Sequence, residues 1–449
     1  MIRLSTICWL VILGNWWLVS QSQVTGEEST IFQKPIRLQA QQKDIDTGEL
    51  WGHSGPAVAD VDGDGLRDLV VGDYSGKFHF FRNIGSNRDP KYAAPKYLMA
   101  GDVEAQVNIY CCIGSSPHFV DLDGDGDLDM ISGSYDPGEC YLFRGLGGAK
   151  FAERETIVDK SGKAVVRVPD QKGPIQSFGS WPTTVDWDHD GKPDLLVGAF
   201  GGEMFVRLNV GSRQKPEFAA TNLMVQAGGK ELQVPDGHAT PVVTDWDDDG
   251  RWDILSGSDS GAVYFYQNVG EPGAPRFEEA RVLIGPHEGR GTDKLVEIDA
   301  EPTPGIRSQI AAVDYNGDGK VDLLVGDFRT TISPRPELTP TDRAAIQTIL
   351  KQLRDGEQHS PPEVDKACEE MEEDMARRFP GEERYSEKGM AAYKIAYKKL
   401  HESKEFKQWR AGTEKLNESL TKYLVKPERE GSINKYATCH GYVWLFLRK

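Results

Sequence analysis

Aspartate recurs in five segments of the chain with a single spacing, D-x-D-x-D-G-x-x-D, in which one asparagine replaces an aspartate. This spacing places side-chain oxygens at positions 1, 3, 5 and 9, a turn-permitting glycine at position 6 and a backbone carbonyl at position 7. Ca²⁺ is a hard cation that prefers several oxygen ligands, and no cysteine or histidine stands at these positions. The spacing therefore predicts calcium sites, with candidate ligands Asp60, Asp62, Asp64, Asp68, Asp121, Asp123, Asp125, Asp129, Asp186, Asp188, Asp190, Asp194, Asp245, Asp247, Asp249, Asp253, Asp314, Asn316, Asp318 and Asp322.

The residues after each segment distinguish these sites from an EF-hand. Position 12 holds valine or serine in place of a bidentate glutamate. An apolar run follows each segment and predicts a strand rather than a helix. Asp-Gly turns that bind no ion would explain one such loop, but five loops that keep their ligand positions favour about five Ca²⁺ ions. We expect an affinity in the weak extracellular range of about 10⁻⁴–10⁻³ M.

The five segments also mark a repeat. Their first residues, at positions 60, 121, 186, 245 and 314, are 61, 65, 59 and 69 residues apart, a period that suits a four-stranded propeller blade. In each repeat a short apolar run enters the acidic segment and a second run leaves it. An aromatic-rich run and an outer run follow in most repeats, and short runs bounded by glycine fit strands. The sequence therefore predicts an all-β propeller.

The two ends of the chain predict how this ring closes. Residues 436–449 carry an aromatic strand like the third strand of the other repeats, and no outer strand follows it. An additional strand, residues 31–39, precedes the first repeat. We expect this N-terminal strand to complete the last blade, because ring closure removes exposed strand edges. The predicted propeller covers residues 30–330 and the final strand, with five four-stranded blades.

The repeats resemble the FG-GAP repeat of integrin α-subunit propellers, a repeat also known as the VCBS type in exported bacterial proteins. The resemblance rests on the acidic segments and the strands after them, and it covers residues 30–330 and the last ten. It implies a propeller fold, calcium in the blade loops, and a role in adhesion or recognition. This chain departs from integrins, which typically have seven blades, in its five segments and in a helical insertion.

That insertion, residues 331–430, interrupts the last repeat. A helix is expected to start at Thr339-Pro340, a second to run from Pro362 to about Phe379, and a third helical stretch to run from Ser386 to about Leu424. The helices would pack on themselves or on the propeller rim. A docking arm for a partner protein is the other interpretation.

The N-terminus and the charge indicate where the protein acts. Residues 1–22 have the pattern of a signal peptide with a cut after Ser22, which predicts a secreted, periplasmic or cell-surface protein without stable membrane insertion after signal removal. The expected disulfide then joins Cys140 to Cys111 or Cys112, because both ends fall in one repeat, and buried free thiols are the alternative. A net charge of −18 argues against nucleic-acid binding.

A second set of residues precedes the acidic segments by seven positions. His53, His238 and Arg307 stand there in three repeats and glycine stands there in the other two. With Trp51 and Trp181 nearby, these side chains would surround one end of the central channel. A funnel of this kind suits a sugar or a polyanion, whereas a purely structural role in the loops is the alternative.

No sequence motif of a known catalytic class accompanies these sites: the nucleophile elbow, the zinc-protease helix and the phosphate-binding loop do not occur. We therefore expect a non-enzymatic, exported, calcium-binding propeller that serves protein interaction, adhesion or scaffolding. Its partner would be an unidentified protein or glycan. A carbohydrate-binding lectin is the first alternative, and a propeller enzyme of the polysaccharide lyase type is the second.

Overall fold

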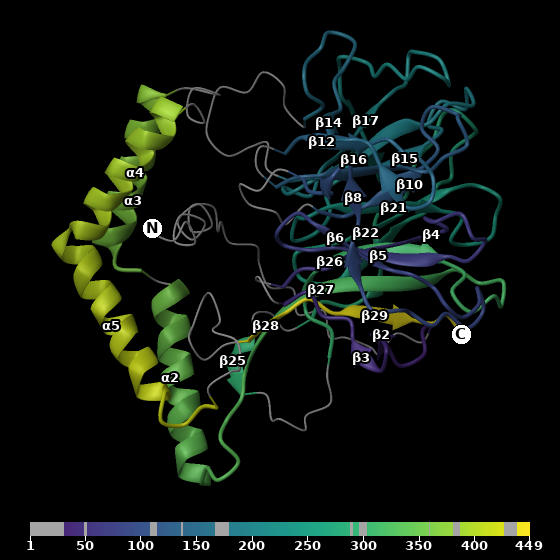
Figure 1. The fold of residues 1–449 in the computed structure, drawn as a ribbon. Helices are drawn as coiled ribbons and strands as arrows, with labels where there is room; N and C mark the ends of the chain where they lie inside the picture. Colours follow the sequence, from purple (N-terminus) through teal and green to yellow (C-terminus); the bar gives the residue numbers. More distant parts are fainter. Residues whose placement is uncertain are drawn as a thin grey trace.

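A computed structural model describes residues 31–48, 52–107, 115–135, 138–166, 179–287, 291–295, 303–358, 360–379, 387–425 and 438–449. Within these ranges the chain is mostly β-sheet, with four helices gathered to one side of the sheets (Figure 1). The sheets hold the acidic segments, and the helices form the insertion.

Four of the sheets are built in the same way from consecutive stretches of the chain. Each has four antiparallel strands that neighbour one another in chain order. The first sheet has β4 (Gly55–Ala59), β5 (Asp68–Gly72), β6 (Phe78–Phe81) and β7 (Lys96–Tyr97). The second has β10 (His118–Val120), β11 (Asp129–Gly133), β12 (Cys140–Phe143) and β14 (Glu155–Thr156). The third has β15 (Ser180–Val185), β16 (Asp194–Ala199), β17 (Met204–Arg207) and β18 (Leu223–Met224). The fourth has β21 (Thr240–Thr244), β22 (Asp253–Gly257), β23 (Val263–Tyr266) and β24 (Arg281–Ile284).

The fifth sheet takes its strands from both ends of the chain. Strand β26 (Ile306–Val313) pairs with β27 (Asp322–Ile332), β27 pairs with β29 (Val443–Phe446), and β29 pairs with β1 (Ile36–Arg37). The far end of β27 also pairs with β25 (Gly291–Leu295) and β28 (Thr438–His440). The N-terminal strand thus lies against the C-terminal one, as the extra strand before the first repeat led us to expect.

Short strand pairs connect the outer parts of the sheets. They are β2 (Gln39–Ala40) with β3 (Lys43–Asp44), β8 (Met99–Ala100) with β9 (Val103–Glu104) and β13 (Lys150–Phe151), and β19 (Gln226–Ala227) with β20 (Lys230–Glu231).

The first strands of the five sheets gather around one cavity. Strand β4 contacts β10, β10 contacts β15, β15 contacts β21, β21 contacts β26, and β26 contacts β4. These strands and the residues just before them line a cavity of about 200 Å³. Pro56, Pro182 and Pro241 lie within them, and each first strand is the edge of its sheet. Proline is tolerated at an edge because its missing N–H costs no ladder hydrogen bond, and it leaves that edge unable to pair fully with another strand.

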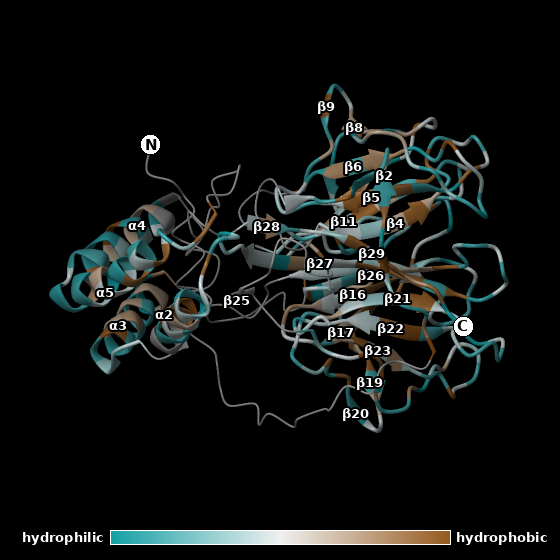
Figure 2. Cartoon of the chain, turned by 90° about the horizontal axis from the view of Figure 1, so that it is seen from below, coloured by the Kyte–Doolittle hydropathy of each residue, from teal (hydrophilic) through white to brown (hydrophobic). Residues whose placement is uncertain are grey.

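Five hydrophobic clusters join the sheets in a cycle. The second strands are apolar on both faces, as in Leu69-Val70-Val71, so each can pack against two neighbouring sheets. Val70 lies in the cluster shared with the second sheet, whereas Leu69 lies in the cluster shared with the fifth. The remaining clusters join the second sheet to the third, the third to the fourth and the fourth to the fifth. Figure 2 shows this apolar character along the sheet strands, beside helices that are largely hydrophilic.

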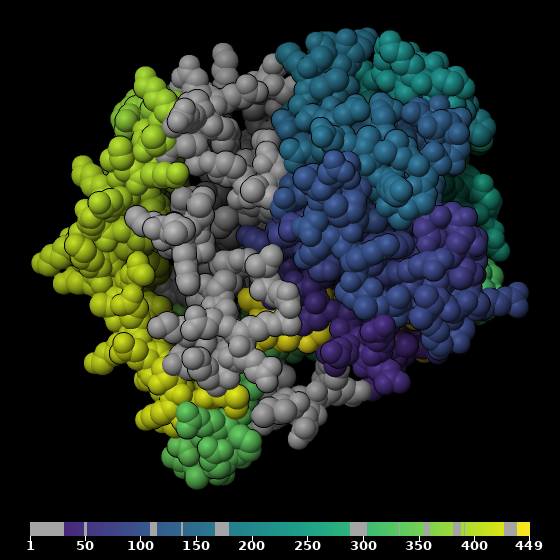
Figure 3. Space-filling view, viewed as in Figure 1, coloured from purple at the N-terminus to yellow at the C-terminus, as the bar shows by residue number. Residues whose placement is uncertain are grey.

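The insertion forms helices α2 (Pro340–Gln358), α3 (Pro362–Arg378), α4 (Glu387–Glu402) and α5 (Lys404–Leu420). The helical stretch expected from Ser386 to about Leu424 is present as two helices, α4 and α5, and this division was not predicted. Ser403 separates α4 from α5 because its side chain caps α5 by accepting a hydrogen bond from the Phe406 N–H at 3.2 Å. The helices have apolar clusters of their own, and the space-filling view shows them at one side of the molecule (Figure 3).

Two further expectations concern the ends and the cysteines. The expected signal peptide, residues 1–22, lies outside the described residues, and none of the described helices is long and apolar enough to cross a membrane. Cys140 is a free thiol, so the expected disulfide is not formed; Cys111 and Cys112 lie outside the described residues. Burial raises the pKa of Cys140 to about 12, which keeps the thiol protonated and unreactive.

Candidate metal centres

The five acidic segments occupy the same place in the five sheets. Each connects the first strand to the second, and its ninth residue is the first residue of the second strand. Since the first strands lie around one cavity, the loops lie at the end of the cavity toward which these strands run. Backbone topology therefore positions the five loops equivalently.

The ninth aspartate of each loop fastens the loop to its sheet. In the first loop, Asp68 Oδ2 accepts a hydrogen bond from the Val61 N–H at 3.2 Å, and Asp68 Oδ1 accepts one from the Asn83 N–H at 2.7 Å. Burial raises the pKa of Asp68 to about 6 despite these donors. The same two bonds recur at Asp129, Asp194, Asp253 and Asp322. The ninth aspartate therefore stabilises the loop through backbone hydrogen bonds and is also a candidate ligand.

The first aspartate sets the turn in four of the loops. Asp60 Oδ2 accepts a hydrogen bond from the Gly65 N–H at 2.9 Å, and the third, fourth and fifth loops repeat this contact. Gly65 has φ +87°, and a Cβ there would meet nothing within 4 Å. The glycine at position 6 is thus required for its backbone angle and not for space.

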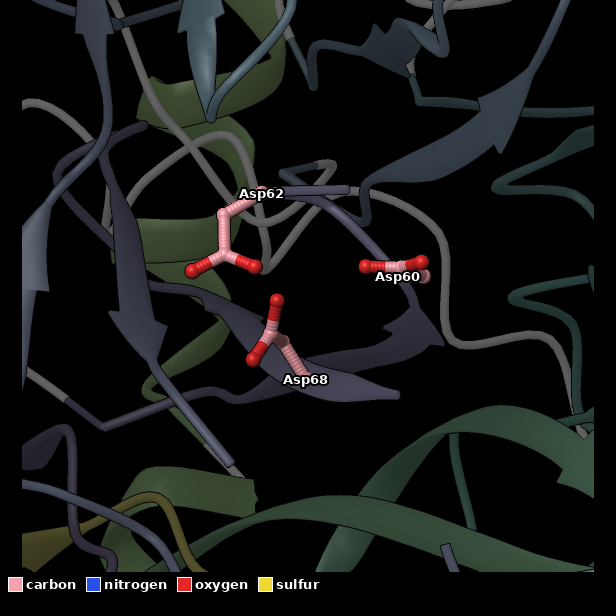
Figure 4. A group of neighbouring side chains, drawn as sticks. All are labelled: Asp60, Asp62 and Asp68. Atoms are coloured by element: carbon pink, nitrogen blue, oxygen red, sulfur yellow. The ribbon is translucent and has the colours of Figure 1, made fainter. Parts of the chain in front are cut away.

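Carboxylate oxygens come within 4.8 Å of one another in four loops. In the first loop the side chains of Asp62 and Asp68 face each other with Asp60 beside them (Figure 4). The other three groups are Asp121, Asp123 and Asp125; Asp186, Asp188 and Asp194; and Asp245, Asp247 and Asp253. Within the described residues the fifth loop forms no such group. There Asn316 stands at position 3, and its amide nitrogen lies 3.2 Å from Asp318 Oδ2.

Some carboxylate oxygens in these loops are buried without a hydrogen-bond partner, and this bears on whether the loops suit a cation. Asp60 Oδ1, Asp123 Oδ1 and Asp247 Oδ1 are buried and accept no hydrogen bond. A buried acceptor without a partner is costly, and a cation that prefers oxygen ligands would relieve that cost. The donor set of the first, second and fourth loops therefore fits a metal ion.

Basic side chains reach the first two loops from the end of the third strand. Arg82 Nε lies 2.6 Å from Asp62 Oδ2, and its Nη2 lies 2.7 Å from Asp64 Oδ2. Arg144 Nη1 lies 2.9 Å from Asp123 Oδ2. The sequence spacing alone did not reveal these contacts, because Arg82 stands 20 residues from Asp62.

The predicted funnel residues lie at the opposite end of the first strands. His53, His238 and Arg307 have φ of 66°, 60° and 57°, and Gly179, the described glycine at the equivalent position, has φ 72°. Arg307 Nη1 lies 3.2 Å from His53 Nε2. The ring of Trp181 lies 4.3 Å from that of His238, edge to face. The structure brings these four side chains together in two pairs, and Trp51 lies outside the described residues.

A second set of side chains lies at the same end of the first strands and was not predicted from the sequence. Each second strand contains a glycine four residues after its first aspartate, and the residue two positions after that glycine is aromatic in four sheets and aspartate in one. These residues, called the rim below, are Tyr74, Tyr135, Phe200, Asp259 and Phe328. The repeated pattern of glycine, any residue and then an aromatic residue was available in the sequence as a signal.

The sheets and the acidic loops form a repeat with one local architecture. Residues 121–197 and 245–325 match the FG-GAP-like repeat family, so this part of the chain contains FG-GAP-like repeats. The chain is similar to cartilage acidic protein 1 of Homo sapiens, with 22% identity over 289 residues, which are 63% of this chain and 39% of that protein. The Xenopus tropicalis protein of the same name is 22% identical over 199 residues, 44% of this chain and 26% of that protein. The chain thus spans well under half the length of these relatives.

Solved structures that align with part of this chain include two enzymes. A GH43_1 enzyme from Xanthomonas citri aligns with a TM-score of 0.37 and 11% identity, covering 63% of this chain and 84% of the enzyme. The RS223 β-xylosidase aligns with a TM-score of 0.36 and 9% identity, covering 64% of this chain and 88% of the xylosidase.

Proposed function

We propose that this protein is an exported, calcium-binding β-propeller of five blades that serves as a protein-interaction, adhesion or scaffold module. One observation carries the proposal: five hydrophobic clusters join each sheet to the next, and one of them joins the fifth sheet back to the first. A chain of sheets that returns to its start is the arrangement of a propeller. Each sheet is then one blade.

Calcium is the ion that best suits the acidic loops under this proposal. The candidate ligands are carboxylate oxygens with backbone carbonyls nearby, which is the donor set of Ca²⁺ rather than of a soft metal. The orphaned oxygens of Asp60, Asp123 and Asp247 support a cation in their loops. Bound Ca²⁺ would also offset the repulsion among the carboxylates of each loop. The ions would therefore stabilise each blade at its inner turn.

The proposal gives the loops a structural role and not a catalytic one. The ninth aspartates are buried, and both their oxygens already accept backbone hydrogen bonds. A carboxylate held in this way is poorly placed to exchange protons with a substrate. Binding would instead use the surfaces that the rigid ring presents.

Calcium titration tests the proposal. With a dissociation constant of about 10⁻⁴ M, each site would add about 2.7 kcal/mol of stability in 10 mM Ca²⁺. We expect the melting temperature of the chain to rise by many degrees on calcium addition and to fall again with EDTA. Equilibrium dialysis should count about five ions. Mg²⁺ at equal concentration is the control. A melting temperature that changes with neither calcium nor EDTA would disprove the proposal that the loops bind calcium.

Export is tested separately at the N-terminus. We expect the protein recovered outside the cytoplasm to begin at Gln23, because Ser22 precedes the expected cut. Mass spectrometry of the intact chain reads this directly. Recovery of the protein with residues 1–22 still attached would contradict cleavage.

A further inference from the structure

The end of the cavity opposite the acidic loops has two layers of side chains, and we call it the mouth. The inner layer holds His53, His238, Arg307 and Trp181, and the outer layer is the rim. Ring contacts connect the layers: His53 lies 4.6 Å from Phe328 and 5.6 Å from Tyr74, and His238 lies 6.2 Å from Phe200. Tyr135 of the second sheet lies 5.2 Å from Phe200, so side chains from all five sheets meet at the mouth.

The left-handed backbone at His238 and Arg307 makes a hydrogen bond to the preceding sheet for which a glycine would suffice. The Gly179 N–H donates to the carbonyl of Tyr135 in the preceding sheet at 2.7 Å. The His238 and Arg307 N–H groups donate in the same way to the carbonyls of Phe200 and Asp259, at 2.7 and 2.9 Å. Since glycine makes this link without strain, the backbone does not require histidine or arginine there. Strained non-glycine residues of this kind gather at functional sites.

The inner layer also has polar atoms that the protein leaves unsatisfied. Both ring nitrogens of His238 are buried without a hydrogen-bond partner, and so is Trp181 Nε1. His238 is fully buried, and burial lowers its pKa to about 3, so the ring is neutral. Trp181 also lines the central cavity. Unsatisfied buried groups next to a cavity indicate a place for water or a polar ligand.

The charges at the mouth are balanced. Arg307 Nε lies 3.0 Å from Asp259 Oδ1, and the side chain of Asp259 is 34% exposed whereas that of Arg307 is 7% exposed. An anionic ligand would meet the accessible carboxylate first, and a cationic ligand would meet the guanidinium behind it. The pair instead offers an acceptor and a donor to hydroxyl groups. The half-buried rings of Tyr74 and Phe200 offer apolar faces beside them.

We propose that the mouth binds a neutral carbohydrate. A sugar ring has an apolar C–H face that packs on an aromatic ring, and its hydroxyls both donate and accept, which matches the Asp259–Arg307 pair. Pockets with aromatic walls and few polar groups recognise ligands of this type. The inference rests on the proposed ring of five blades, since only closure brings the rim residues together. It gives the binding module a ligand class.

The test is a glycan array followed by calorimetry. The intact chain in 10 mM Ca²⁺ is applied to immobilised neutral and acidic glycans, and the neutral glycan with the strongest signal is titrated in solution. We expect Phe200→Ala and Asp259→Asn each to weaken its binding by about tenfold or more, because both contact surfaces are central to the mouth. Tyr97→Ala, a half-buried aromatic on the outer strand β7, should leave the affinity unchanged.

The outcomes separate this inference from the calcium proposal. Binding to no neutral glycan, binding to acidic glycans alone, or equal affinity in Phe200→Ala, Asp259→Asn and the parent chain would each overturn the inference. The melting temperature of every variant is measured with calcium and with EDTA. A normal calcium response without glycan binding rejects only the carbohydrate site. A missing calcium response in the parent chain rejects the calcium proposal on its own.

Discussion

The first and third acidic loops share one backbone and differ in their compensation of charge. In the first loop Arg82 bridges Asp62 and Asp64 at 2.6 and 2.7 Å. In the third loop Leu208 stands at the place of Arg82 and offers no charge. In the third loop Lys192 pairs with Asp190 at 2.7 Å. Asp190 lies outside the group formed by the other three carboxylates of that loop.

This difference teaches that a repeated motif is not a repeated electrostatic environment. An acidic loop can be neutralised by a side-chain cation or by a bound ion. The first loop has a built-in cation that competes with the metal, whereas the carboxylate group of the third loop depends on an added ion. We therefore expect the five candidate sites to differ in calcium affinity although their backbones agree.

The largest expected effect comes from removing the ninth aspartate, whose two backbone hydrogen bonds are common to both loops. Asp194→Ala in the third loop removes the acceptor of the Trp187 and Asn209 N–H groups, which are part-buried and buried, and leaves both donors without it. Because each unsatisfied donor costs about 1–3 kcal/mol, we expect a loss of about 4 kcal/mol in the free energy of unfolding. Urea denaturation should show this loss with calcium and with EDTA. Asp188→Ala, which removes a ligand without a backbone contact, should lose stability only with calcium.

Asp68→Ala is the matched variant in the first loop. It breaks the same pair of bonds, to Val61 and Asn83, so its loss in EDTA should equal that of Asp194→Ala. Unequal losses in EDTA would mean that the loops differ in their backbone as well as in their charge, contrary to the comparison.

The next effect concerns a carboxylate that a proton neutralises. Asp327 accepts hydrogen bonds from the Tyr442 N–H, the Gly305 N–H and Trp444 Nε1, and burial raises its pKa to about 6 from 3.8. A raised pKa contributes stability that is complete below about pH 4 and lost as the pH rises through 6. The difference of about two pKa units corresponds to about 3 kcal/mol.

Asp327→Asn removes this titration. We define the gap as the unfolding free energy of the parent chain minus that of the variant. We expect this gap to increase by about 2.4 kcal/mol from pH 7.5 to pH 4 in EDTA, since only the parent chain gains the proton. Urea denaturation at several pH values measures this gap. A gap that stays constant or narrows on acidification would show that Asp327 is ionised in the folded protein throughout.

The smallest expected effect comes from exchanging the residue by which the two loops differ, Arg82 in the first loop and Leu208 in the third. Arg82→Leu should raise the calcium affinity of the first loop several-fold, because the ion no longer competes with a guanidinium for Asp62 and Asp64. Leu208→Arg should lower the affinity of the third loop by a similar factor. Isothermal titration of the two single variants and of the double exchange measures both shifts. If neither variant changes the affinity, side-chain cations do not set the order of the sites.

Several features of this fold could be predicted because short patterns in the sequence report them. The turn of each acidic loop depends on contacts within nine residues, such as the one from Gly65 to Asp60, and the spacing of the aspartates reports it directly. The extra strand at the N-terminus and the missing one at the C-terminus indicated the pairing of β1 with β29, because a sheet edge requires a partner. The division of α4 from α5 at Ser403 was missed although the capping residue was visible.

The amino-acid sequence by itself determined where oxygen ligands stand, how often they recur and that strands surround them, since spacing and hydrophobic pattern act over a few residues. Only the tertiary structure decided which charges meet. Arg82 and Asp62 are 20 residues apart, and Arg307 and His53 are 254 apart, yet both pairs are in contact. Such contacts depend on how the sheets pack around the cavity, and that packing is a property of the whole chain rather than of any one repeat.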